Sequence, residues 1–291
     1  MDQRLADVLS VLELEPLEWN LFRGESRDIG SPQVFGGQVL GQALMAASRT
    51  VSGRTVHSLH AYFLRRGDFN APIVYEVDRS RDGHSFSSRR VTAIQHGEQI
   101  FNMAASFQLS EPGLEHQAAM PAVPAPESLP DSGTVPPELA ARLPPRMQRL
   151  LATPRPFEFR SVQPLLQLAQ AAPARQIWFR AVSRVPDDET LHRCLLAYVS
   201  DFYLLETATL PHGISSLSGK AVVASIDHAM WFHRPLRVDD WLLYAVESPS
   251  ASGSRGFARA SVFARDGRLV ASTAQEGLVR LVADCGVDAP R

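Results

Sequence analysis

The chain has 291 residues, 45% of them hydrophobic, which suffices for two domains of ordinary size or one large domain with a substantial core. Its 29 Lys and Arg residues nearly balance its 31 Asp and Glu residues, so the sequence lacks the basic surface of a nucleic-acid-binding protein. No run approaches the roughly 18 apolar residues of a membrane helix, and the N-terminus lacks the pattern of a signal peptide, so we expect a cytoplasmic protein that binds no membrane.

The first half of the chain predicts one helix followed by four strands. The helix, GGQVLGQALMAASRT at 36–50, places Val39, Ala43 and Ala47 on one face, and this stripe of small residues would let a sheet pack closely around it. Gly97 marks a hairpin turn between two of the strands. The predicted strands cover residues 56–66, 71–80, 85–95 and 99–108.

Proline dominates the middle of the chain. Residues 112–164 hold 12 of the 21 prolines, a density that forbids long regular elements. We therefore expect a linker across the surface, with one short helix at 137–151. The predicted division is an N-terminal domain at 1–110, the linker at 111–155 and a C-terminal domain at 156–285.

The second half predicts the same kind of elements. Two strands, at 157–162 and 175–185, precede a helix that begins with Pro-Asp-Asp, favourable residues for a first helical turn, and stays periodically apolar over 186–208. Gly267 marks another hairpin turn. The four strands predicted after the helix cover residues 223–234, 240–248, 255–265 and 268–281.

The two halves are similar in sequence. SLHAYFLRRG in the first half matches SIDHAMWFHRP in the second, with a step of 168 residues from His60 to His228, and the later strands match in the same order. A helix with an antiparallel sheet, twice, is typical of a tandem double hotdog, an α+β fold in which each sheet wraps around a long central helix. Two such halves could pair their sheet edges. The alternative is a generic α+β protein with accidental similarity between its halves.

No common cofactor or metal motif occurs. The sequence lacks GxxxxGK[ST], GGQVLGQA does not match GxGxxG, and HGISSLSG around His212 fails the GxSxG of serine hydrolases. His228 and His233 lie five apart on a predicted strand and face opposite ways, so we expect structural roles for both. Cys194 and Cys285 form neither a CxxC pair nor a zinc pattern. We therefore expect no cofactor, no metal ion and no disulfide.

One carboxylate falls on an apolar helix face. Asp201 shares that face with Cys194, Tyr198 and Leu205. Burying a charge is costly unless it is hydrogen-bonded, so Asp201 either has a function or reaches solvent as a capping residue. Burial would raise its pKa toward the range that suits a general base.

Two polar residues occur only in the second half. Ser225 matches His57 in the sequence comparison, and Gln275 matches Ala105. Because a duplicated fold needs only one working site, such positions are candidates for that site. A plain strand hydroxyl and a surface amide are the alternative interpretations.

Several segments carry a resemblance to a known family. In order, they are LFRGESRDIG, QVFGGQVLGQAL, VHSLHAYFLRRGD, RDGHSFSSRRV, VPDD, IDHAMWFHRP and VASTAQEG. Over nearly its whole length the sequence resembles acyl-CoA thioesterase II, the TesB-type double-hotdog thioesterases. That family activates water with an Asp, a Thr and a Gln. The motifs match the Asp to Asp201 and the Gln to Gln275, whereas Ser225 replaces the Thr.

The resemblance implies hydrolysis of an acyl-CoA thioester to a fatty acid and coenzyme A. Asp201 would take a proton from a water molecule held by Ser225 and Gln275. Ser225 keeps the hydroxyl of the family Thr but lacks the methyl group that stiffens χ1. Gly36 and Gly37, at the start of the first helix, are candidate donors to the oxyanion. We also expect a homo-oligomer.

Two other functions remain open. A hotdog hydratase or dehydratase acting on acyl-CoA would use an Asp and a His, which leaves Ser225 and Gln275 without a role. A non-catalytic acyl-CoA-binding protein would fit if the serine marked a lost activity.

Overall fold

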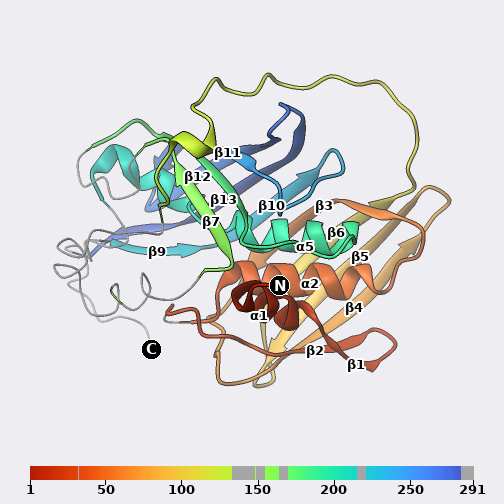
Figure 1. Cartoon of the computed structure of the whole chain (residues 1–291). Helices are drawn as coiled ribbons and strands as arrows, with labels where there is room; N and C mark the ends of the chain where they lie inside the picture. The colour runs from red at the N-terminus through yellow and green to blue at the C-terminus, as the bar shows by residue number, and fades with distance from the viewer. Residues whose placement is uncertain (32, 133–147, 149–154, 164–169, 215–220, 283–291) are drawn as a thin grey trace.

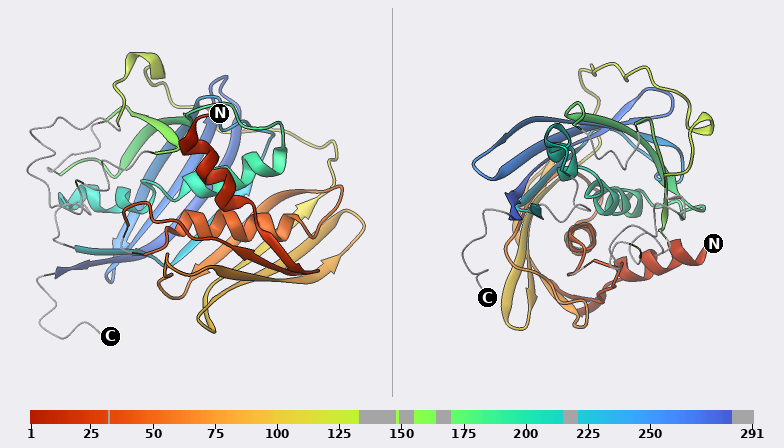
Figure 2. Two further views of the ribbon diagram at one scale, coloured as in Figure 1. Left: turned by 60° about the horizontal axis from the view of Figure 1, so that its bottom comes forward. Right: turned by 90° about the vertical axis from the view of Figure 1, so that its left-hand side faces the viewer.

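One antiparallel sheet curls around two central helices, α2 (Gly36–Ser48) and α5 (Glu189–Ser200), which lie side by side (Figures 1 and 2). The computed structural model describes residues 1–31, 33–132, 148, 155–163, 170–214 and 221–282. Gly37 permits the close approach of the two helices, because a Cβ atom there would lie 2.2 Å from the carbonyl oxygen of Tyr198. In the described residues the strand order is β1-β2-β4-β5-β6-β3-β10-β13-β12-β11-β8-β7, with β9 also paired to β13.

The first half contains the predicted helix and the four predicted strands. These strands are β3 (Thr55–Phe63), β4 (Ile73–Asp82), β5 (Phe86–Gln95) and β6 (Glu98–Gln108). The sequence analysis did not predict α1 (Gln3–Leu12), β1 (Glu15–Glu18) and β2 (Leu21–Gly24). The side chain of Asp2 caps α1 by accepting from the Arg4 N–H, and the helix buries Leu5, Val8 and Leu12. An amphipathic helix and two short strands therefore extend the first half beyond the repeat.

The second half contains the remaining strands and two short 3₁₀ helices. The strands are β7 (Phe157–Ser161), β8 (Ala174–Ala181), β9 (Ala221–Ser225), β10 (Asp227–Phe232), β11 (Leu242–Ser252), β12 (Arg255–Ala264) and β13 (Leu269–Leu281). The 3₁₀ helices are η1 (Pro126–Ser128) and η2 (Leu205–His212). All strand pairs of the sheet are antiparallel, as a hotdog half requires.

The second central helix is shorter than the sequence pattern predicts. The pattern indicates a helix over 186–208, but α5 ends at Ser200. Tyr203 has a left-handed φ of 63°, which interrupts the helical backbone before η2 begins. Asp201 is therefore the C-cap of α5, and the prediction that it lies within a continuous apolar helix face is wrong.

The two matching sequence segments pair with each other at the centre of the sheet, as β3 and β10. Backbone hydrogen bonds show how the halves correspond: the Leu64 N–H donates to the Ile100 carbonyl, and the His233 N–H donates in the same way to the Val270 carbonyl. Leu64 and His233 are 169 residues apart. The 168-residue step of the sequence comparison is therefore wrong by one residue in this strand.

A β-bulge divides the strand predicted at 223–234. β9 ends at Ser225, which lies opposite Gly277 of β13, and beyond Ile226 the pairing continues as β10 with its register shifted by one residue. The first half has the same shift between Val56 and the residues that follow it. The bulge is thus a shared feature of both copies of the fold.

The bulge changes which residues correspond between the halves. Ser225 corresponds to Val56, and the comparison of Ser225 with His57 is wrong. Gln275 corresponds to Ala105, as the sequence comparison has it. The polar residues of the second half therefore replace apolar core residues of the first.

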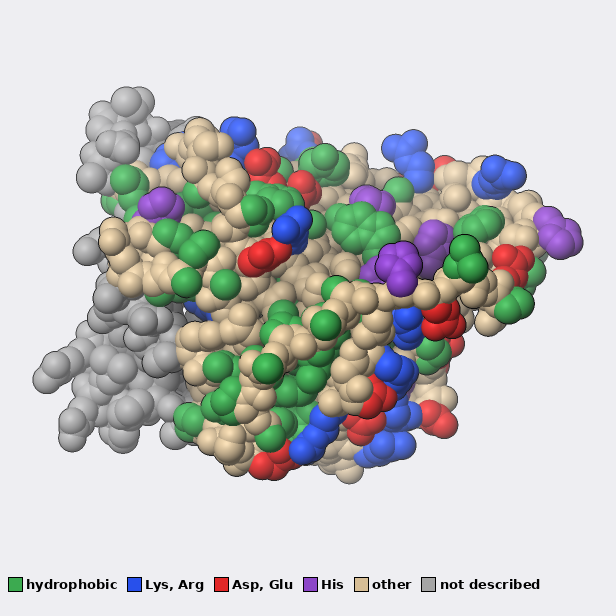
Figure 3. Space-filling view, turned by 90° about the horizontal axis from the view of Figure 1, so that it is seen from above, with side chains coloured by type: hydrophobic (Ala, Val, Ile, Leu, Met, Phe, Trp, Pro, Cys, Tyr) green, Lys and Arg blue, Asp and Glu red, His purple; other side chains and the backbone are tan. Residues whose placement is uncertain are grey.

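Some expectations fall outside the described residues. The helix predicted at 137–151 does so except for Gln148, and so does Cys285. The domain boundaries, the cytoplasmic location and the homo-oligomer stay predictions. In the described part of the chain, no helix combines the length and apolarity needed to cross a membrane. Basic and acidic side chains lie among one another on the face in Figure 3, in keeping with the balanced composition.

Candidate active site

The three predicted site residues come together where α5 ends. Asp201 caps α5, Ser225 ends β9 and Gln275 lies in the middle of β13. The Gln275 Nε2 donates to Asp201 Oδ1 at 2.8 Å and to Ser225 Oγ at 3.1 Å. The fold thus brings a carboxylate, a hydroxyl and an amide from three separate elements into contact.

The bulge at Ile226 sets the direction of the Ser225 side chain. In a regular strand Ser225 and His228, three residues apart, would face opposite sides of the sheet. The extra residue turns both inward, since Ser225 Oγ lies 3.1 Å and His228 Nδ1 lies 3.3 Å from the Gln275 Nε2. Bulges next to active sites commonly redirect a side chain in this way.

The Asp201 carboxylate is nearly buried, with 7% of its side chain exposed. Burial raises the pKa of Asp201 because the charged form loses its hydration, and hydrogen bonds from the Gln275 side chain and the Gly37 N–H partly oppose that shift. A carboxylate with a raised pKa that is held in place by hydrogen bonds is suited to taking a proton from water.

The start of α2 faces this carboxylate. The Gly37 N–H donates to Asp201, and a Cβ atom at Gly36 would lie 2.8 Å from Asp201 Oδ2. Gly36 lines the neighbouring cavity, whereas Gly37 is buried. The two candidate oxyanion donors therefore differ, because the N–H of Gly37 already serves Asp201.

Sequence reasoning missed His228 as a member of the site. Its ring is fully buried, and its Nε2 lies 3.0 Å from both Ser200 Oγ and Thr273 Oγ1. Burial lowers the pKa of His228 to about 3, so the ring is neutral at ordinary pH. The position of His228 in the IDH motif after Ser225 was a usable signal, but the assumption of one regular strand hid it.

A cavity of about 540 Å³ lies beside Asp201 and Ser225, which both line it. Phe63 and Phe101 contribute apolar walls, and the exposed Arg66 also belongs to its lining. A cavity of this size with apolar walls and a few polar groups is typical of a small-molecule site. The arrangement can therefore hold an apolar chain against an activated water molecule.

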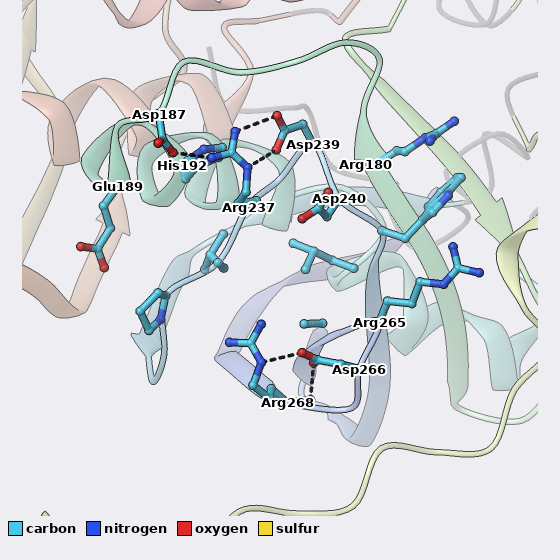
Figure 4. A pocket seen from close by; sticks show the side chains of 15 residues that line it. Arg180, Asp187, Glu189, His192, Arg237, Asp239, Asp240, Arg265, Asp266 and Arg268 are labelled. Carbon is cyan, nitrogen blue, oxygen red and sulfur yellow. Dashed lines mark hydrogen bonds and ion pairs between the residues drawn. The ribbon is translucent and has the colours of Figure 1, made fainter. Parts of the chain in front are cut away.

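A second cavity, of about 780 Å³, lies at the start of α5 (Figure 4). Its charged side chains largely pair with each other: Arg237 binds Asp187 and Asp239, and Arg268 binds Asp266. None of the predicted site residues lines it. Across the described residues, no three His, Cys, Asp or Glu side chains form a group that could hold a metal ion. The cavity beside Asp201 is therefore the candidate site.

Both halves match known families. Residues 23–108 match the acyl-CoA thioesterase N-terminal domain, and residues 155–278 match acyl-CoA thioesterase. The chain is 44% identical over 285 residues to acyl-CoA thioesterase 2 of Haemophilus influenzae, covering 96% of this chain and 99% of that protein. It is also 44% identical over 291 residues to human acyl-coenzyme A thioesterase 8, covering 96% and 91% of the two chains.

A solved structure shares the whole fold. The crystal structure of an acyl-CoA thioesterase II, TesB2 from Mycobacterium marinum, has a TM-score of 0.76 and 43% sequence identity, covering 94% of this chain and 98% of that chain. The resemblance and the tandem double-hotdog fold predicted from the sequence are thereby confirmed. The chain belongs to the acyl-CoA thioesterase II (TesB) family of thioester hydrolases.

Proposed function

We propose that the chain hydrolyses acyl-CoA thioesters with a water molecule that Asp201 activates and that Ser225 and Gln275 help to hold. The observation that carries this mechanism is the hydrogen bonding of the buried carboxylate and the hydroxyl to one amide, beside an apolar cavity. Family membership supports the class of reaction, and these contacts support the assignment of the water to this place.

In the proposed mechanism Asp201 takes a proton from water while the water oxygen attacks the thioester carbonyl carbon. We assign the Gly36 N–H to the developing oxyanion, because Gly36 lines the cavity and the Gly37 N–H is engaged by Asp201. When the carbon–sulfur bond breaks, the departing thiolate receives the proton from Asp201. The products are the free acid and coenzyme A, and Asp201 returns to its ionised form.

A hydratase or dehydratase would need an imidazole that reaches the substrate. His228 Nδ1 does lie 3.9 Å from Asp201 Oδ1, but His228 is fully buried and does not line the cavity. The contacts of Ser225 with Gln275 also have no role in that chemistry. Hydrolysis therefore accounts for more of the site.

The release of free thiol tests the proposed function. The purified protein is mixed with acyl-CoA of several chain lengths, and a thiol reagent follows the coenzyme A that appears. Hydrolysis gives a signal, whereas hydration or simple binding gives none. Absence of thiol release at every chain length would contradict the proposal.

The Ser225 variants test whether the serine holds water or acts as a nucleophile. A nucleophilic serine needs a base within hydrogen-bond reach, but the described neighbour of Ser225 Oγ is the Gln275 amide, which is not a base. We expect Ser225→Thr to keep or modestly raise kcat. Ser225→Ala should lower kcat by about tenfold, the size of one lost hydrogen bond.

Intact-protein mass measurement provides the control for the Ser225 variants. In rapidly quenched single turnovers of the unmodified protein, we expect no species heavier by one acyl group. Such an adduct on Ser225, or a Ser225→Ala rate at background, would instead establish a covalent mechanism.

Arg66 is our candidate for the phosphates of coenzyme A. Arg66 is exposed in the cavity lining and forms no ion pair in the described residues, whereas the neighbouring Arg65 pairs with Glu98 at 2.9 Å. We expect Arg66→Ala to raise KM roughly tenfold with little change in kcat, because the contact is remote from the reacting bond. Added salt should shrink this difference.

A matched control is Arg90→Ala, which removes another exposed arginine that does not line the cavity. This variant should leave KM unchanged. Equal effects of the two substitutions would mean that Arg66 acts only through the overall charge.

A further inference from the structure

We propose that His228 is a positioning residue that fixes the orientation of the Gln275 side-chain amide, so that the NH2 group of Gln275 faces Asp201 and Ser225. This inference rests on the proposed function, because it explains how the amide is held in the assigned mechanism. His228 itself does not line the cavity and is fully buried, so it acts through Gln275 and not on the substrate.

Two hydroxyl groups determine which ring nitrogen of His228 carries the proton. Ser200 Oγ donates to the Ala197 carbonyl at 2.9 Å, and Thr273 Oγ1 donates to the Ala229 carbonyl at 2.8 Å. Each hydroxyl has one hydrogen, so both oxygens can only accept from His228 Nε2, which lies 3.0 Å from each. The Nε2 atom is therefore protonated in the neutral ring.

The other ring nitrogen then accepts. With the proton on Nε2, His228 Nδ1 presents a lone pair to the Gln275 side chain, whose Nε2 lies 3.3 Å away. A flipped amide would place its oxygen against this lone pair and against the carboxylate of Asp201, which are both acceptors. Only one orientation of the amide satisfies both neighbours.

Burial makes this arrangement independent of ordinary changes in pH. The loss of hydration lowers the pKa of His228 to about 3, so Nδ1 stays free of a proton in the neutral range. Asp201, whose Oδ1 lies 3.9 Å away, is the ionisable group that faces the ring. The polarity of the amide thus stays fixed while Asp201 changes its protonation.

The first half of the fold shows that this position does not require histidine for packing. With the corrected correspondence, the four buried or half-buried polar residues Ser225, His228, Thr273 and Gln275 match Val56, Leu59, Met103 and Ala105. All four counterparts belong to the hydrophobic core. A buried polar group costs stability unless it is hydrogen-bonded, so the retention of His228 points to a function in the second half.

The test compares two variants of the full chain by thiol release. His228→Leu installs the residue that the first half carries at this place, and His228→Asn keeps an acceptor oxygen near the position of Nδ1. We expect His228→Leu to lower kcat about tenfold, with KM unchanged within about twofold, since the amide still fits but is no longer oriented. The acid limb of its kcat/KM profile should move to higher pH, because the Gln275 hydrogen bond that lowers the pKa of Asp201 is weakened. His228→Asn should recover most of kcat.

A double-mutant cycle separates positioning from a merely structural role. If His228 acts through Gln275, His228→Leu should cause no further loss of kcat in a Gln275→Ala background. Additive losses, or an unaltered kcat in the single variant, would overturn the inference. If the unmodified protein releases no thiol, the proposed function itself fails, which is a different result.

A measurement on the unmodified protein keeps the inference testable even if a variant does not fold. Nitrogen NMR of ¹⁵N-histidine-labelled protein reports the tautomer of each ring, and the signal lost in His228→Asn, or in another His228 variant that folds, identifies His228. We expect the Nε2-protonated neutral form, unchanged between pH 5 and pH 8. A proton on Nδ1, or titration within that range, would overturn the inference.

Discussion

Asp201→Asn is expected to abolish turnover while the protein stays folded. The substitution is nearly isosteric but removes the only group in contact with Gln275 that we assign as a base. A positioned general base contributes about 10² to 10⁴ in rate, so less than about a hundredth of kcat should remain in the thiol-release measurement. Retention of more than about a tenth would place the base elsewhere.

The same substitution should raise stability at neutral pH. Burial raises the pKa of Asp201 in the folded state, so the folded chain binds this proton more tightly than the unfolded chain does. Ionisation of Asp201 therefore destabilises the fold, with no effect below the unfolded pKa of about 4 and the full effect above the folded pKa. We expect Asp201→Asn to have the higher Tm at pH 7 and to lose this advantage as the pH falls toward 4.

Asp239→Asn is the matched control, because Asp239 is also buried, with 3% of its side chain exposed. Although burial alone would raise the pKa of Asp239, hydrogen bonds from Arg237 and the Val185 N–H outweigh it and lower the pKa. Its ionised form therefore stabilises the fold above the unfolded pKa. Asp239→Asn should lower Tm at pH 7 and leave kcat unchanged, the opposite of Asp201→Asn in both measurements.

Gln275→Ala is expected to lower kcat by about 10- to 100-fold, as for a lost hydrogen bond to a charged group. The Gln275 amide contacts Asp201 and Ser225 but does not line the cavity, so KM should change little. Ala105 occupies the corresponding place in the first half, so alanine is compatible with this strand. A change in KM alone would contradict the assigned role.

The control for Gln275 is Gln95, a buried glutamine of the first half whose Nε2 donates to the carbonyls of Asp68 and Ala71. Gln95→Ala should lower the free energy of unfolding, because it leaves two carbonyl groups without their donor. Its kcat should equal that of the unmodified protein. If both variants lose activity equally, the effect of Gln275→Ala would be ascribed to lost stability.

The sequence predicted much of this site because local patterns encode it. The apolar spacing before Asp201 holds over α5, and the absence of a counterpart for Gln275 follows from comparing the halves. The end of α5 was not predictable in this way, because Tyr203 adopts a left-handed backbone that its side chain does not announce. Local apolar periodicity continued past a break that tertiary contacts stabilise.

Ser225 and His228 show the limit of the alternation rule. A bulge adds one residue without any mark in the sequence, and it moves every later side chain to the other face. The rule therefore matched Ser225 with the wrong residue and separated His228 from the site. The N-terminal α1, β1 and β2 were missed for another reason, since they have no counterpart in the repeat that guided the assignment.

The pairing of β3 with β10 has a consequence for how the chain assembles. If the two halves were separate polypeptides, this central pair of strands would form only by association, and its occupancy would fall on dilution. Within one chain the partners remain at a high effective concentration, whatever the concentration of the protein. The β3–β10 interface therefore behaves as a part of the folding reaction, so dilution of the protein does not separate the halves.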